Sequence, residues 1–243
     1  MKKRELEERV LKLAEPLFEK LYGKFSFDPE QTDRPDAAIN VYKPHRRFGR
    51  KAGPFRVGIE ITTVDKGQDL AYLNDEKYGR DRVIAQTKDV LENGFDSVRP
   101  IKKAEIDIPE SYIYDGAISK KIKYQRYLES GTYREIILLC FSDVIATDTI
   151  LFKELLEGST DYLLSKAQFP FDAVMFASLR QGNPVRVYRK DNPRLTPPAP
   201  SNYSGVTETV VHGPTMRFDQ TYNLREIMSN EPLITRRQPK PAP

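Results

Sequence analysis

The chain has 243 residues, enough for one sizeable hydrophobic core with appendages. Its single cysteine excludes an intramolecular disulfide, and its two histidines argue against structural zinc and against hydrolases built on histidine clusters. A net charge of +4 only weakly indicates polyanionic partners. No apolar run is long enough to cross a bilayer and the basic start has no apolar segment behind it, so we expect a cytoplasmic protein without membrane contact.

The first part of the chain has the pattern of one helix followed by strands. Over residues 4–22, leucine and valine recur every three or four positions, which places them on one helical face. Pro16 is expected to kink or split this helix. Alternating and β-branched residues then predict strands at 24–27, 37–42 and 55–64.

The second part continues with alternating helices and strands after a polar, irregular segment. We interpret residues 66–110 as an insertion or lid that contains a helix at 80–93. A helix is expected at 118–129, with Ile118, Ile122, Gln125 and Leu128 near its packed face. The remaining predicted elements are strands at 134–141, 171–178 and 185–188 and a helix at 148–165.

The order of these elements predicts an α/β fold with a central mixed sheet flanked by helices. We assign this domain to residues 1–190, with the 66–110 insertion inside it. From residue 191 to 243 closely spaced prolines predict an extended tail that buries too little apolar surface to fold alone. Within the tail, residues 206–228 are candidates for docking on the core or on a partner.

Two carboxylates lie on neighbouring predicted strands. Asp36 begins one strand and Glu60 lies inside the next, so a hairpin-like connection brings them together. A glutamate inside a strand is most often a solvent-facing residue of a half-exposed sheet, but here it has a second acid within reach. Two converging carboxylates without histidine favour Mg²⁺ or Mn²⁺ over zinc.

These residues resemble the motif of the PD-(D/E)xK nuclease superfamily, whose core is restriction-endonuclease-like. Pro35-Asp36 matches the first half of the motif, and Ile59-Glu60-Ile61-Thr62 stands where the second half belongs. The resemblance covers residues 4–188 apart from the insertion. It implies a metal-dependent nuclease that hydrolyses phosphodiester bonds, with DNA favoured over RNA as the substrate. Asp36 and Glu60 would bind Mg²⁺ or Mn²⁺. In some members the first helix adds an acid, for which Glu15 or Glu19 is a candidate.

Thr62 departs from the motif, which has a lysine at this position that helps to position and deprotonate the attacking water. One alternative is a lysine reaching the same place from the following helix. Lys121 and Lys123 are our candidates, with Lys66 behind them and Gln125 orienting the water. The other alternative is a domain that binds nucleic acid without cutting it. The same lysines are also typical of the solvated face of a helix.

A basic segment connects the two strands that carry the acids. Its glycines and prolines indicate a loop, and its candidate contacts to a phosphate backbone are Lys43, Arg46, Arg47, Arg50 and Lys51. Three functions therefore stay open: a metal-dependent nuclease, an inactive nuclease-like protein with a nucleic-acid-binding or inhibitory role, and a structural or assembly protein. For the last, the tail would contact a second copy or another protein.

Overall fold

The computed structural model describes residues 3–31, 33–49, 52–66, 102–201, 203 and 206–212, with the backbone alone for 3, 102–105 and 206–212. Its contacts divide the chain into two units. The larger unit combines Met1–Asp65 with Ile108–Val206, and the smaller combines Lys66–Asp107 with Thr207–Pro243. No helix in the described part of the chain is both long and apolar enough to cross a membrane.

The larger unit begins with one helix and three antiparallel strands. Helix α1 (Lys3–Tyr22) leads into β1 (Gly23–Phe27), β2 (Ala37–Pro44) and β3 (Phe55–Thr63), and β2 pairs antiparallel with both other strands. The turn from α1 into β1 requires glycine, because Gly23 has a φ of +93° and a Cβ there would lie 2.3 Å from a backbone oxygen.

Of the two effects predicted for Pro16, a kink or a split, the split does not occur, because α1 runs through this residue without a break. Ala14 and Phe18, on either side of Pro16, are fully buried in the core against the sheet. We infer that this packing holds the helix together across the hydrogen bond that proline cannot donate.

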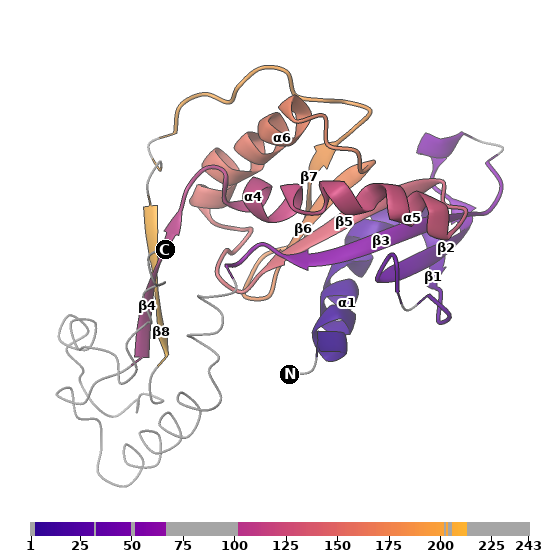
Figure 1. Cartoon of the computed structure of the whole chain (residues 1–243), viewed down its shortest axis with the longest axis horizontal. Helices are drawn as coiled ribbons and strands as arrows, with labels where there is room; N and C mark the ends of the chain where they lie inside the picture. Colours follow the sequence, from indigo (N-terminus) through magenta and orange to yellow (C-terminus); the bar gives the residue numbers. More distant parts are fainter. Residues whose placement is uncertain are drawn as a thin grey trace, which may run out of the picture. The chain divides into compact units, whose positions relative to one another are not determined.

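The rest of the larger unit adds short helices and three strands. In chain order these are α4 (Tyr112–Ile118), the 3₁₀ turn η3 (Lys121–Lys123), α5 (Tyr124–Ser130), β5 (Glu135–Ser142), the π-helical turn η4 (Phe152–Leu156), α6 (Glu157–Lys166), β6 (Ala173–Ser178) and β7 (Val185–Arg189). The sheet has the order β1-β2-β3-β5-β6-β7. Strand β5 is parallel to β3 and β6, whereas β7 is antiparallel to β6. The predicted α/β fold with a mixed, helix-flanked sheet is therefore confirmed (Figure 1).

Helices cover both faces of this sheet (Figure 1). Helix α1 packs on the face that includes Val57, Ile59 and Ile61 of β3. Because side chains alternate along a strand, Glu60 points to the opposite face, where α4 and α5 lie. The predicted alternation in β3 is therefore correct, and it places an acid beneath helices rather than in solvent.

The helix predicted at 118–129 is instead three short pieces, and its predicted packed face is wrong. Ile122 and Leu128 are 84% and 46% exposed, whereas Tyr127 is buried. The rings of Tyr124 and Tyr127 lie 5.0 and 6.1 Å from the ring of Phe171. Because these aromatic contacts bury large apolar areas, they fix a different face of α5 against the sheet.

The smaller unit contains a two-stranded sheet. It joins β4 (Lys102–Ile108), from the predicted insertion, to β8 (Val206–His212), from the predicted tail. Part of the predicted tail is therefore a paired strand. The helix predicted at 80–93 and the chain after residue 212 lie outside the described residues.

Candidate active site

The two predicted metal-binding carboxylates lie next to each other. In the β2–β3 pair, Ala37 stands opposite Ile59, so Asp36, one position before β2, stands opposite Glu60. The Asp36 carboxylate accepts a hydrogen bond of 2.8 Å from the Ile61 backbone N–H, which fixes it against β3. Asp36 and Glu60 thus form a cross-strand acidic pair.

The turn before β2 delivers Asp36 to this place. The Arg34–Pro35 peptide is cis and Arg34 has a φ of 54°. Pro35 packs over Gly58, where an added Cβ would lie 2.9 Å from the Pro35 Cγ. Gly58 is on the same face as Glu60, two residues earlier, so its missing side chain gives the turn the space to approach β3.

Lys120 is the cation nearest to the acidic pair in the described part of the chain. Its amine lies 2.6 Å from Glu60 Oε1, and the two side chains are only 15% and 5% exposed. The Tyr127 hydroxyl also interacts with Glu60 and lowers the pKa of this acid. Lys120 stands at the start of η3 and Tyr127 in α5, so the segment after the insertion covers the acid from above the sheet.

Burial controls the protonation of these groups. It raises the pKa of Glu60, and the charge of Asp36 raises it further, whereas Lys120 and Tyr127 lower it. Burial and the charge of Glu60 likewise raise the pKa of Tyr127, so its hydroxyl stays protonated and donates. Glu60 is therefore an acid whose ionisation depends on a positive neighbour.

The acidic pair opens into a cleft of about 520 Å³. The residues that line the cleft include four acids and four bases: Glu7, Asp33, Asp36, Glu60, Arg34, Lys120, Lys123 and Arg126. Arg34, Lys123 and Arg126 are exposed, whereas Glu60 is buried at the base. The cleft therefore combines an acidic pair, in which Glu60 is buried and Asp36 half-buried, with an exposed rim. On that rim Arg34 pairs with Asp33 at 3.5 Å, and Lys123 and Arg126 add positive charge.

The other predicted catalytic residues are placed differently. Lys123 lines the cleft, as the sequence led us to expect, but Lys121 does not, because its amine donates to the Ala167 carbonyl oxygen. Gln125 is exposed beside Glu129 and does not line it either. The 3₁₀ turn η3 begins directly after Lys120. Lys120 therefore faces the acids in place of Lys121.

The first helix brings two acids near Asp36. Glu7 lines the cleft, whereas Glu15 lines a neighbouring pocket that also includes Asp36. Lys66 is exposed and is not among the lining residues. The sequence did not identify Glu7 and Lys120 for the same reason. Local spacing does not specify where along the sheet a helix packs, and therefore which of its residues face the cleft. Lys120 belongs to a lysine-rich run that the sequence did single out.

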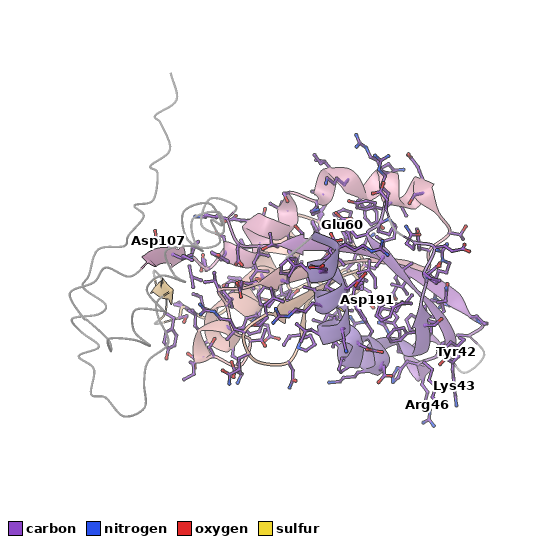
Figure 2. All side chains as sticks on the ribbon, turned by 90° about the horizontal axis from the view of Figure 1, so that it is seen from below. Tyr42, Lys43, Arg46, Glu60, Asp107 and Asp191 are labelled. Atoms are coloured by element: carbon purple, nitrogen blue, oxygen red, sulfur yellow. The ribbon has the colours of Figure 1, made fainter. Side chains whose placement is uncertain are left out.

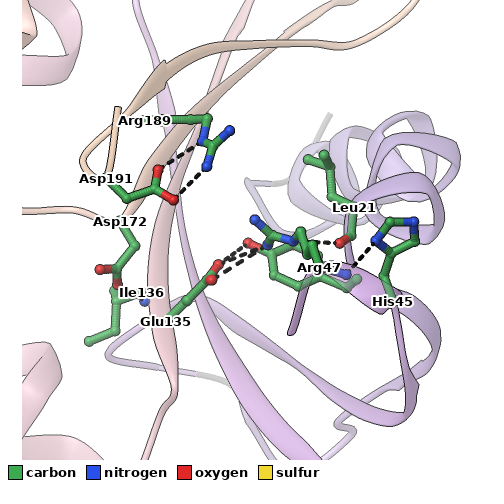
Figure 3. A network of polar contacts seen from close by, with 9 residues as sticks. Leu21, His45, Arg47, Glu135, Ile136, Asp172, Arg189 and Asp191 are labelled. Carbon is green, nitrogen blue, oxygen red and sulfur yellow. Dashed lines mark hydrogen bonds and ion pairs between the residues drawn. The ribbon is translucent and has the colours of Figure 1, made fainter. Parts of the chain in front are cut away.

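The basic segment stands at the other end of the β2–β3 hairpin. Arg47, in the 3₁₀ turn η1 (Arg46–Phe48), pairs with Glu135 at 3.2 Å and donates to the Leu21 carbonyl oxygen (Figure 3). Its guanidinium lies 4.2 Å from the centre of the Phe48 ring. Arg47 therefore ties the loop to α1 and β5.

Of the other predicted contacts in this segment, Lys43 and Arg46 are exposed. They lie at one end of the larger unit, apart from Glu60 (Figure 2). Arg50 and Lys51 lie outside the described residues. The geometry therefore separates the basic loop from the cleft, so the rim bases are the nearest groups for a phosphate beside the acidic pair.

The magnesium site stays a prediction, for which the structure provides two neighbouring carboxylates. No group of three or more Asp, Glu, His or Cys suited to a metal occurs among the described residues, so an all-protein cage is not present there. Mg²⁺ is commonly bound through only one or two carboxylates, with water and phosphate oxygens completing the shell. Burial is the main cause of the raised pKa of Glu60 and repulsion from Asp36 adds to it; a hard cation beside the acids would relieve that repulsion.

Comparison with protein-family models, with curated proteins and with solved structures found no match. The functional argument therefore rests on the geometry of the cleft: two adjacent acids, a half-buried lysine and exposed bases at the rim.

Proposed function

We propose that the chain is a nuclease-like phosphodiester hydrolase, dependent on Mg²⁺ or Mn²⁺, with a restriction-endonuclease-like core and with DNA favoured over RNA. The observation that carries the proposal is the Lys120 amine on Glu60, next to Asp36. Thr62 leaves the motif without its lysine, and Lys120 supplies an amine at the acidic pair from the segment that follows the strand.

The topology supports the same interpretation. One helix, three antiparallel strands, a helical segment and a strand parallel to β3 follow each other in the order that the resemblance implies. The acids come from the beginning of β2 and the later half of β3, and Lys120 comes from the crossover between β3 and β5.

The residues of the cleft divide the work of binding. Arg34, Lys123 and Arg126 bind phosphate oxygens at the rim, where exposed side chains can follow a nucleic-acid backbone. Asp36 and Glu60 at the base hold the cation. The bases at the rim stay away from this cation because both are positively charged. A phosphate held between rim and base is therefore positioned over the acidic pair.

The groups around the acids prepare the chemistry. A bound Mg²⁺ would supply Lewis-acid activation of the phosphate and would lower the pKa of a water molecule. The Lys120 amine orients the attacking water by hydrogen bonding and stabilises the negative charge that develops on the phosphate. The Tyr127 hydroxyl holds Glu60 and the Ile61 N–H holds Asp36, so neither acid has to reorganise during the reaction.

The same ion pair favours a second candidate, an inactive nuclease-like protein that binds nucleic acid or inhibits another protein. Because Lys120 already neutralises Glu60, the acidic pair has a counter-charge without any metal. In that case the basic rim still binds phosphate and no cleavage occurs. The structural or assembly alternative stays a prediction, since most of the tail lies outside the described residues.

Cleavage of supercoiled and linear DNA by the full chain, with Mg²⁺, Mn²⁺ or EDTA, tests the proposal. Cleavage should require the metal and should disappear in Asp36→Asn, while Lys121→Met, a matched control outside the cleft, should cleave like the wild type. Binding of a labelled duplex is measured in parallel. Binding without cleavage under all metal conditions would favour the second candidate, and neither binding nor cleavage would leave the assembly alternative.

A further inference from the structure

A second surface lies on β1 and β2, on the side of the sheet opposite to α1. Phe25 and Phe27 of β1 pack towards the core that α1 covers. Lys24 and Ser26 alternate with them and are exposed, so this side of β1 is open to solvent. The residues that follow on β2 give the open side a distinctive chemistry.

A β-bulge presents Tyr42 on β2. Lys24 pairs with Lys43 and Phe25 pairs with Val41, which leaves Tyr42 without a partner on β1. Tyr42 is 58% exposed, the most exposed aromatic residue among the large hydrophobic residues that the structure describes. Bulges commonly re-aim a side chain at a functional surface, and here the bulge turns an aromatic ring outwards.

Uncompensated positive charge flanks this ring. Lys24 and Lys43 stand directly opposite each other, an arrangement that destabilises a strand pair when both residues are charged. Neither lysine takes part in an ion pair within the described part of the chain, and Arg46 lies at the same end of the larger unit (Figure 2). The arrangement fits a polyanion, because bound phosphates would relieve the repulsion between the lysines.

The surface lies in line with the cleft. Alternate residues of a strand share a face, so Asp36 and Tyr42 are on the same side of β2. At about 3.3 Å per residue, they are about 20 Å apart along the strand. A nucleic acid lying along β2 would therefore reach Tyr42 a few nucleotides away from the phosphate at the acidic pair.

We propose that Tyr42, Lys24, Lys43 and Arg46 form a binding surface for a single-stranded segment of nucleic acid. Tyr42 stacks on an unpaired base, and the three basic side chains contact the flanking phosphates. A single strand fits better than a duplex, since an exposed ring needs a base that is free to unstack. The link to cleavage rests on the proposed function: the substrate would carry a single-stranded region about 20 Å from the scissile phosphate.

Fluorescence anisotropy with a labelled oligothymidine strand and with a blunt duplex of equal length tests this surface. All measurements use the full chain in EDTA, so that they do not depend on cleavage. Tyr42→Ala should raise the Kd for the single strand about tenfold and leave the duplex Kd nearly unchanged, while Tyr42→Phe should bind like the wild type because it keeps the ring. Lys43→Gln should lower the slope of log Kd against log salt by about 0.7, whereas Lys153→Gln, at an exposed site on η4, should not.

Two outcomes would overturn the inference. One is an unchanged single-strand Kd in Tyr42→Ala, and the other is an equal loss for strand and duplex. Thermal melting of each variant shows whether the fold is intact, and the Tyr42→Phe result distinguishes loss of stacking from loss of fold. If the wild type never cleaves but Tyr42→Ala still weakens single-strand binding selectively, the proposed hydrolysis fails and the binding surface stands.

Discussion

Replacing Lys120 by methionine separates the catalytic role of the amine from metal binding. Methionine keeps most of the apolar stem and removes the charge that contacts Glu60 at 2.6 Å. Loss of one pre-positioned donor that stabilises developing charge commonly costs about 100- to 1,000-fold in rate. We therefore expect cleavage to fall by about that factor while Mn²⁺ affinity is kept or increased, because a competitor for Glu60 has gone.

The same change has a calculable effect on stability. A hydrogen bond to a charged group contributes about 1.5–3 kcal/mol, and breaking a fully buried ion pair costs more. Here Lys120 is 15% exposed and Glu60 keeps its bond from Tyr127, so we expect a loss of about 2 kcal/mol. For a chain of this size that corresponds to a fall in Tm of about 4–8 °C in the absence of metal.

The pH dependence gives a readout that a merely structural role would not produce. Lys120 lowers the pKa of Glu60, so Lys120→Met raises it. The acid limb of metal binding, and of any residual cleavage, should therefore move to higher pH. The pKa of Glu60 in the folded protein is above its ordinary value. Stability therefore falls as pH rises from the ordinary pKa to the folded-state pKa. In Lys120→Met this fall should extend to higher pH.

Lys121→Met is the matched control for these measurements. It removes the neighbouring amine, which donates to the Ala167 carbonyl oxygen outside the cleft. Cleavage rate, Mn²⁺ affinity and the position of the acid limb should all match the wild type. If Lys121→Met abolished cleavage and Lys120→Met did not, the assignment of Lys120 would be refuted.

Three further predictions follow from other contacts of the structure. Glu60→Gln should keep the fold and abolish Mn²⁺ binding in titration calorimetry, and unchanged affinity would contradict the metal assignment. Gly58→Ala should push the turn at Pro35 away from β3, because the new Cβ would lie 2.9 Å from the proline ring, and it should lower both the Tm and Mn²⁺ affinity; a Tm equal to that of the wild type would show that the turn adjusts freely. Arg47→Met should lower the Tm by breaking the pair with Glu135 and leave the Kd for nucleic acid nearly unchanged, and a large rise in Kd would return Arg47 to the binding surface.

The sequence was sufficient to predict the acidic pair because its determinants are local. The alternation in β3 assigns Glu60 a face, and a hairpin brings the start of β2 opposite it. The position of the amine has no local determinant. Tyr124 and Tyr127 pack on Phe171, a residue far along the chain, and this contact sets which lysine faces the sheet.

The basic loop shows the same limit: the sequence alone does not reveal which of its charged residues have a partner in the fold. A run of lysine and arginine between two strands has the pattern of a phosphate-binding loop, and nothing within the run distinguishes its members. Arg47 has its partner in Glu135, which enters only when β5 is laid beside β3. The bulge that exposes Tyr42 likewise depends on the pairing of β1 with β2 and leaves no mark in the β2 sequence.

The charge balance of the cleft connects these observations to its mechanism. Its four acids and four bases cancel, so the empty cleft has little net attraction for a phosphate. A divalent cation at Asp36 and Glu60 would make the cleft positive and would release Lys120 from neutralising Glu60. The metal and the phosphate should therefore bind cooperatively, each raising the affinity of the cleft for the other. The positive metal attracts the phosphate, and the negative phosphate stabilises the bound metal. If nucleic acid bound the cleft equally well in EDTA and in Mg²⁺, Lys120 alone would be the counter-charge of Glu60, and the inactive binding protein would be the better description.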